Sequence, residues 1–198
     1  EFKKFRPTNW EEKLLDMIDT NIKQKGLIRV LREGVEDYSL SSNLRLVYFK
    51  PNNNKNQETL KLYNSNIFSL TRQLYFEESA KTSIDLVVSL NGFPIVIIEL
   101  KNKFTGQNIE NGKEQFKLDR SYRSKLSEFN TRTLIYFAVD NDEVSMTTQL
   151  KGEDTFFLPF NKGFEQGAGN PIVEGKFRTY YLWEEILLQD SLLDIFRN

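Results

Sequence analysis

The chain has 198 residues, no cysteine and no histidine, and its 27 basic and 28 acidic residues give a net charge of −1. Without histidine, Ser-His-Asp and Cys-His catalysis and histidine-ligated metal sites are excluded, and without cysteine, so are disulfides and thiolate zinc sites. Because phosphate neutralisation dominates nucleic-acid affinity, this charge argues against a domain that holds DNA strongly by itself.

Length and composition predict a single domain over residues 1–198. Apolar residues make up 39% of the chain and aromatic residues 13%, which is enough for one sizeable core. No apolar run approaches the length of a membrane span, and the first residues lack the hydrophobic region of a signal peptide. We therefore expect a cytoplasmic location, which the absence of cysteine also fits.

The first third of the chain predicts one long helix and two strands. Thr8-Asn9-Trp10-Glu11 is a capping-box pattern, and apolar residues follow it at helical spacing, which predicts a helix over 9–25. The segment 44–49 is typical of a strand, and a further strand is predicted over 67–76.

The rest of the chain alternates strands and helices. Two β-branched runs, 84–90 and 95–101, are joined by Asn91-Gly92, which is a strong hairpin signal. The spacing predicts a helix over 109–123, weakened by Gly112, and then strands over 133–139 and 143–148. The final segment, 181–196, has a helical period but is apolar on more than one face. This order of elements predicts an α/β fold.

The hairpin carries the candidate chemistry, because Asp85 lies on its first strand and Glu99-Leu100-Lys101 ends its second. Four consecutive β-branched residues before Glu99 predict a strand that is covered on both faces, where a charge is costly unless it is compensated. A divalent cation would compensate both carboxylates, and carboxylate ligation favours magnesium or manganese. A salt bridge with Lys101 at the rim of the sheet is the alternative.

The geometry of the hairpin sets a condition for a shared metal. A plain two-residue Asn91-Gly92 loop would pair Leu90 with Phe93 and put Asp85 on the face opposite Glu99. Both carboxylates can reach one metal in only two ways. The turn is either a three-residue loop, Leu90-Asn91-Gly92, in which Gly92 has a positive φ, or one strand contains a β-bulge. We predict that one of these is present.

No nucleotide cofactor is expected. The glycine-containing loops 157–163 and 167–171 do not contain the G-x-x-x-x-G-K-[ST] pattern that cradles phosphates, so they are interpreted as structural loops.

A wider set of motifs accompanies the hairpin. It comprises Ser83-Ile84-Asp85-Leu86, Asn91-Gly92-Phe93-Pro94, Ile98-Glu99-Leu100-Lys101-Asn102, Thr105-Gly106-Gln107, Glu114-Gln115-Phe116, Asp119-Arg120, Phe137-Ala138-Val139-Asp140, Leu158-Pro159-Phe160-Asn161 and Tyr181-Leu182-Trp183-Glu184-Glu185. With these motifs the chain resembles the N-terminal nuclease region of the restriction (R) subunit of type I restriction-modification enzymes, a member of the PD-(D/E)XK nuclease superfamily. The resemblance covers roughly residues 26–196.

This resemblance implies a restriction-endonuclease-like core, in which helices flank a mixed central β-sheet, and magnesium-dependent hydrolysis of DNA phosphodiester bonds. Asp85 and Glu99 match the metal-binding acids of the family, with the Leu100 carbonyl as a further ligand, and Lys101 matches its catalytic lysine. Gln115 matches the glutamine of a Q-x-x-x-Y motif, whereas Asp119 stands where some members have tyrosine.

Two further features are less sharply placed, an acid that many members of the superfamily use and a basic patch. The first is an upstream helical glutamate, for which the candidates are Glu11, Glu12, Glu33 and Glu36. The second is a phosphate-facing basic patch around the site, or alternatively a solvated face, formed by Lys103, Lys117, Arg120, Arg123 and Lys125.

The resemblance also implies partners. They are double-stranded DNA, the methylation and specificity subunits, and a helicase motor that uses ATP and would follow residue 198, so that the chain is expected to be a fragment of a longer subunit. Two alternatives stay open: a docking module for the motor with a silent site, and a stand-alone repair-type nuclease.

Overall fold

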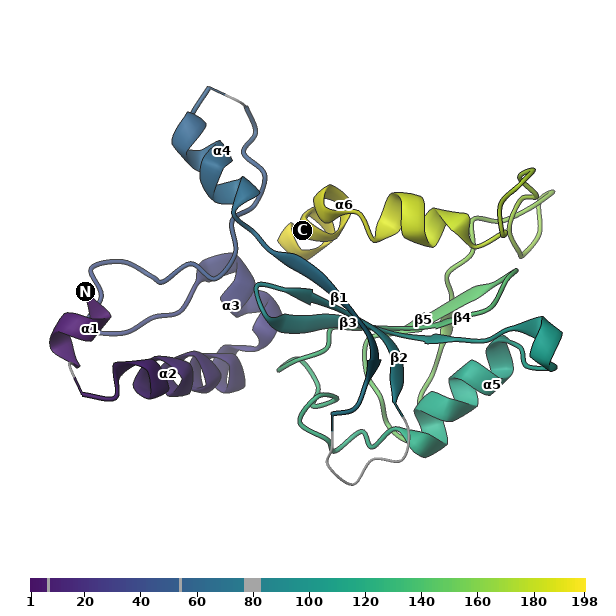
Figure 1. The fold of residues 1–198 in the computed structure, drawn as a ribbon, viewed down its shortest axis with the longest axis horizontal. Coiled ribbons are helices and arrows are strands. Elements are labelled where there is room, and N and C mark those ends of the chain that lie inside the picture. Colours follow the sequence, from purple (N-terminus) through teal and green to yellow (C-terminus); the bar gives the residue numbers. More distant parts are fainter. Residues whose placement is uncertain (7, 54, 77–82) are drawn as a thin grey trace. The chain divides into compact units, whose positions relative to one another are not determined.

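The computed structural model describes residues 1–6, 8–53, 55–76 and 83–198 (Figure 1). They form two compact units, one of residues 1–66 with 193–198 and the other of residues 67–192. The expectation of one domain over the whole chain stays a prediction. No helix in the described ranges has the length and apolar character needed to cross a membrane.

The first unit is helical. Its complete helices are α1 (Phe2–Phe5), α2 (Trp10–Lys25), α3 (Leu27–Glu33) and α4 (Gln57–Asn64). The helix predicted over 9–25 is confirmed as α2, but the predicted capping box is wrong. Asn9 is the N-cap, it has a left-handed conformation (φ 51°), and no side chain caps the helix.

The strand predicted over 44–49 is wrong. Within it only Leu44 forms a β-bridge, an isolated one with Val35. The Asn66 side chain accepts from the Tyr48 N–H at 3.2 Å and donates to the Tyr48 carbonyl at 2.6 Å. An amide side chain therefore satisfies the main-chain groups that a neighbouring strand would otherwise pair.

The second unit contains a six-stranded sheet in the order β1-β2-β3-β4-β5-β6. Its strands are β1 (Phe68–Leu74), β2 (Ile84–Leu90), β3 (Phe93–Leu100), β4 (Ile135–Val139), β5 (Val144–Thr147) and β6 (Leu158–Pro159). Only β3 and β4 are parallel among the paired strands of the described residues, and the other pairs are antiparallel. This mixed sheet, flanked by helices, confirms the predicted α/β, restriction-endonuclease-like fold.

The crossover between β3 and β4 covers one face of the sheet. A short 3-10 turn, η1 (Lys103–Thr105), leads into α5 (Ile109–Glu114), which continues as a π-helical turn, η2 (Gln115–Asp119). The predicted helix over 109–123 therefore ends at Asp119, and its last turn is wider than an α-helix.

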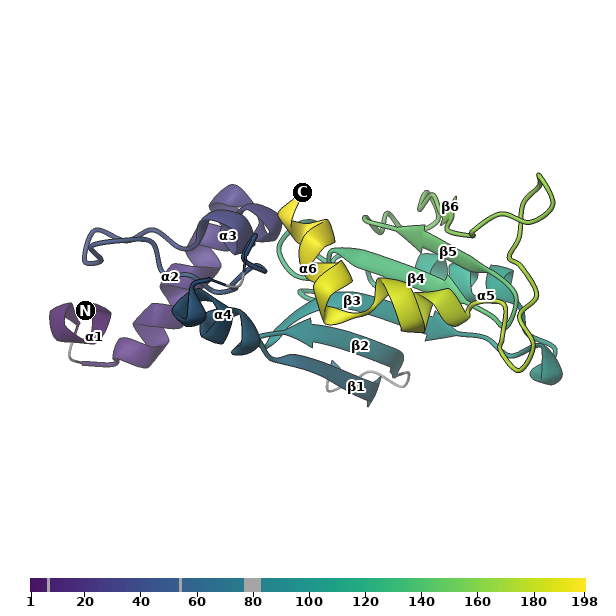
Figure 2. The same cartoon turned by 90° about the horizontal axis from the view of Figure 1, so that it is seen from above.

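Another helical segment lies on the opposite face, as Figures 1 and 2 show. It is the π-helical η3 (Leu182–Ile186), which precedes α6 (Gln189–Arg197). The helix predicted over 181–196 is thus present but interrupted between Ile186 and Gln189.

The core beneath α5 and η2 joins the crossover to three strands. Phe116 from η2 is 1% exposed and packs edge-on against Tyr136 of β4, with ring centroids 5.7 Å apart. The other buried members of this cluster are Ile84, Val87, Ile97, Ile109, Ala138 and Leu150. This packing fixes the crossover against the face of the sheet that carries Asp85 and Glu99.

Candidate active site

The connection between β2 and β3 is a two-residue turn. Asn91 (φ 49°) and Gly92 (φ 88°) both have positive φ, as a tight type I′ hairpin requires. Leu90 accordingly pairs with Phe93. The three-residue loop is therefore not formed, and the predicted alternative, a bulge, must correct the register.

That bulge is present one pair further along. Ser89 pairs with Pro94, but its neighbour Val88 pairs with Val96, so Ile95 is the extra residue on β3. An extra residue shifts the alternation of side chains on one strand by one position. The predicted bulge is confirmed.

The bulge brings the two acids together. Because Leu86 pairs with Ile98, the next position on each strand sets Asp85 opposite Glu99. Both side chains then point to the same face, which is the face that α5 and η2 cover. A charge repulsion between the two carboxylates follows directly from this register.

Glu99 is fully buried, and a single basic side chain neutralises it. The guanidinium of Arg120 donates from Nε to Glu99 Oε1 at 2.7 Å and also from Nη2 to the same oxygen. The two side chains are 4% and 0% exposed. The other carboxylate oxygen, Oε2, is buried and has no hydrogen-bond partner among the described residues.

The electrostatics of Glu99 reflect this environment. Burial raises the pKa of its carboxyl from 4.5 to about 7, against the lowering effect of the Arg120 charge. Asp85 raises it further, by its own charge and because a protonated Glu99 can share a hydrogen bond with it. The two carboxylates are therefore close enough to compete for one proton or one cation.

Asp85 is held from two sides. Its Oδ2 accepts from the Leu100 N–H at 2.8 Å, and its Oδ1 accepts from Nε2 of Gln73 on β1 at 3.2 Å. Unlike Glu99, Asp85 is only half-buried. The main chain of Leu100 thus lies beside the acid pair, and a role for its carbonyl as a metal ligand stays a prediction.

The side chains of Lys101 and Gln115 are in contact. The Nζ of Lys101 donates to Oε1 of Gln115, and the Lys101 N–H donates to the Val139 carbonyl at 2.8 Å. The lysine side chain is thereby directed toward η2 on the same face as Glu99. Gln115 is thus half-buried against Lys101 and is not a solvated helix position, and its role in catalysis stays a prediction.

Gly112 belongs to the site although the sequence pattern did not indicate it. A Cβ atom at Gly112 would lie 3.2 Å from Cβ of Ala138 and 3.4 Å from Cγ of Lys101. Glycine therefore lets α5 approach β4 and the stem of the lysine closely. A glycine inside a predicted helix, read as a weakness of the helix, was the available signal.

One member of the expected basic patch is not on the surface. Arg120 is 5% exposed and pairs with Glu99, so its predicted place on a phosphate-facing surface is wrong. Lys103 pairs with Asp142, and the guanidinium of Arg123 stacks on Tyr122 with 5.2 Å to the ring centroid.

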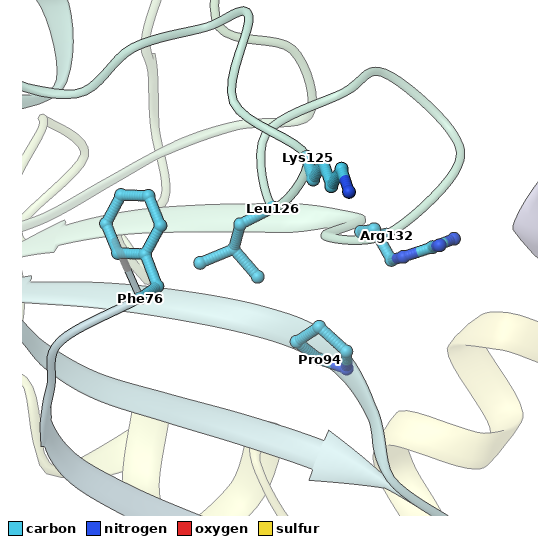
Figure 3. A pocket seen from close by; sticks show the side chains of 5 residues that line it. All are labelled: Phe76, Pro94, Lys125, Leu126 and Arg132. Carbon is cyan, nitrogen blue, oxygen red and sulfur yellow. The ribbon is translucent and has the colours of Figure 1, made fainter. Parts of the chain in front are cut away.

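Lys117 and Lys125 are the other two members of that set. Lys117 is half-buried. Lys125 lines a cavity of about 350 Å³ with Phe76, Pro94, Leu126 and Arg132 (Figure 3).

Five acidic candidates from the sequence analysis remain. Asp119 is exposed at the end of η2. The four upstream glutamates all belong to the first unit, where Glu33 pairs with Arg29 and Glu36 with Lys25. The choice among them stays open.

The donor set fits a hard divalent cation. Two carboxylates face each other, and one buried oxygen, Glu99 Oε2, lacks a protein partner among the described residues. Oxygen ligands of this kind suit magnesium or manganese. No third acidic side chain joins the pair in the part of the chain that the structure describes, so main-chain oxygen, water or substrate would complete the coordination.

Comparison with known proteins agrees with this geometry. The family model described as type I restriction enzyme R protein N terminus matches residues 2–155 of the chain. Neither the search of curated proteins nor the search of solved structures gave a match.

Proposed function

The chain belongs to the type I restriction enzyme R protein N-terminus family, and on that premise we propose that Asp85, Glu99 and Lys101 form a magnesium-dependent site that hydrolyses DNA phosphodiester bonds. The observation that carries the proposal is the bulge at Ile95, which sets the two carboxylates opposite each other with one buried oxygen unpartnered. A rim salt bridge would need neither the bulge nor the burial of Glu99.

The acid pair provides the metal ligands. Asp85 and Glu99 would hold magnesium, or manganese, with the Leu100 carbonyl as a third oxygen. When bound, such a cation lowers the pKa of water and neutralises charge on the phosphate. The hydrogen bonds from Leu100 and Gln73 hold the Asp85 carboxylate, so its oxygens are oriented before substrate arrives.

Lys101 provides a positive charge on the face of the sheet that carries the acid pair. Its ammonium is a compact point charge with three donors, which suits it to position the attacking water or to stabilise charge that develops on the phosphate. Gln115 holds Nζ through its Oε1 and leaves two further N–H groups of the ammonium for water or phosphate. We assign Gln115 the role of orienting this lysine.

Delivery of the substrate is assigned to other parts of the enzyme. The net charge of −1 and the burial of Arg120 against Glu99, which removes one member of the expected basic patch, argue that the chain has little electrostatic hold on DNA by itself. We propose that an ATP-driven motor, acting with the methylation and specificity subunits, brings double-stranded DNA to this site in the cytoplasm. The isolated chain is then expected to cut DNA poorly.

The test is Lys101→Ala in the full-length subunit, assembled with its partner subunits. DNA cleavage and ATP hydrolysis are measured side by side, with Lys103→Ala as the matched control, because Lys103 lies two residues away and pairs with Asp142. We expect Lys101→Ala to abolish cleavage and leave ATP hydrolysis intact. Retained cleavage would mean that this site is not catalytic and would favour the docking-module interpretation.

A further inference from the structure

We propose that Arg120 is a positioning residue of the nuclease site, which holds Glu99 Oε1 so that Oε2, beside Asp85, is the oxygen presented to the divalent cation. The inference rests on the proposed function, because it concerns the same acid pair. It assigns a role to a side chain that the sequence placed on a DNA-facing surface.

The asymmetry of the contact carries the argument. An arginine that only neutralises a carboxylate commonly does so with two parallel hydrogen bonds, one to each oxygen. Here both Nε and Nη2 of Arg120 donate to Oε1 of Glu99, while Oε2 is buried without a hydrogen-bond partner among the described residues. Leaving a buried carboxylate oxygen unsatisfied is costly. A proton shared with Asp85 satisfies Oε2 in the metal-free protein, and a divalent cation bound between the two carboxylates takes the place of that proton.

A second anchor ties the guanidinium to the other strand of the hairpin. Nη2 of Arg120 also donates to the Ser83 carbonyl at 2.7 Å, two residues before Asp85. One planar guanidinium therefore contacts Glu99 on β3 and the main chain that leads into β2. Because the guanidinium is rigid, these contacts fix the Glu99 carboxylate relative to the strand that carries Asp85.

The π-helical turn explains how Arg120 reaches this position. In an α-helix, side chains five residues apart point about 140° apart. The turn η2 is instead closed by a bond from the Arg120 N–H to the Gln115 carbonyl at 3.2 Å, and such a wider turn returns residues five apart to nearly the same side. Gln115 therefore meets Lys101 while Arg120 meets Glu99.

The experiment measures manganese binding to the 198-residue chain by the loss of the free-ion EPR signal, which requires no cleavage. Arg120→Lys keeps the positive charge beside Glu99, so the variant is expected to fold, but one ammonium cannot reproduce the planar fork. Arg123→Lys is the matched control, since Arg123 is exposed and donates to Tyr122. Urea unfolding of each variant establishes that the binding data come from folded protein.

We expect Arg120→Lys to weaken the Kd for manganese about ten- to hundred-fold, as is typical for loss of a residue that orients a ligand, and Arg123→Lys to leave it unchanged. A lower unfolding midpoint with an unchanged Kd would show that Arg120 acts only on stability and would overturn the inference. A tighter Kd would overturn it as well, because it would make Arg120 a competitor of the cation.

Asp85→Asn separates this inference from the proposed function. If Asp85→Asn abolishes manganese binding while Arg120→Lys does not affect it, the metal site stands and only the role of Arg120 fails. If the wild-type Kd does not depend on Asp85, the proposed metal site fails, and the role of Arg120 fails with it.

Discussion

Leu86 lies opposite Ile98 in the antiparallel ladder of β2 and β3. The next pair outward is Asp85 and Glu99, so this one pairing decides whether the two acids share a face. The tight turn at Asn91-Gly92 would set the opposite arrangement, and the extra residue Ile95 reverses it. The candidate site is therefore a product of strand register.

Asp85→Asn should stabilise the metal-free protein at alkaline pH while it abolishes cleavage. The pKa of Glu99 is raised to about 7, partly by the charge of Asp85. A raised folded-state pKa contributes stability below the unfolded value of 4.5 that is lost as pH rises through about 7. Removing the Asp85 charge lowers the pKa of Glu99 and reduces that loss.

The expected gain in the free energy of unfolding is about 1 kcal/mol, which corresponds to somewhat less than one pKa unit. It should develop between pH 5 and pH 8.5, measured by urea unfolding in the presence of a chelator. A difference between variant and wild type that is the same at both pH values would contradict the placement of Asp85 beside Glu99.

Gln115→Leu should reduce DNA cleavage about ten- to hundred-fold, because Lys101 loses the side chain that orients its ammonium. The loss should be smaller than that caused by Lys101→Ala, since the charge itself remains. Cleavage rates of the assembled enzyme check this, with Gln107→Leu as the control, because Gln107 is exposed. Equal rates for Gln115→Leu and wild type would remove Gln115 from the site.

Gly112→Ala should reduce cleavage with little change in stability. Alanine is favoured over glycine in a helix by about 1 kcal/mol, which offsets part of the cost of crowding Ala138 and Lys101 at 3.2 and 3.4 Å. The displaced lysine stem should misplace Nζ. Adding Ala138→Gly removes the nearer contact and should restore part of the cleavage rate; a double variant no better than Gly112→Ala would argue against steric displacement.

Phe116→Ala should lower the free energy of unfolding by about 3–5 kcal/mol, the usual cost of truncating a buried phenylalanine. Phe116 packs against Tyr136 and Phe157, with ring centroids 5.7 and 5.9 Å away. Phe104→Ala is the control, because Phe104 is 90% exposed and its loss should change stability by less than about 0.5 kcal/mol. Urea unfolding distinguishes the two, and similar values would mean that Phe116 does not support the crossover.

Local pattern was sufficient for the hairpin and the central strands. Alternation and turn chemistry predicted β2, β3 and β4. The condition that both acids share one face predicted either a three-residue loop or a bulge, and the register shows the bulge. The segment 44–49 has the same kind of pattern, yet Asn66 and not a neighbouring strand satisfies Tyr48. Sequence pattern expresses the preference of a segment, whereas a strand also needs a partner.

The pairing of Arg120 with Glu99 could not be predicted from the sequence pattern, for a different reason. Its neighbours in the chain are charged or polar, which is typical of a solvated surface. Its side chain follows a π-helical turn, in which Phe116 is buried, and the spacing of apolar residues in this segment predicted an ordinary helix and not such a turn. Only the three-dimensional structure therefore identifies Arg120 as the partner of Glu99.

The bulge at Ile95 also constrains how this segment can evolve. A substitution between Phe93 and Glu99 alters packing, but the loss or gain of a single residue there returns the two carboxylates to opposite faces. Selection on the site therefore acts on the length of this stretch as well as on its composition. Diverging copies that keep the activity should vary in residue identity here far more than they vary in residue number.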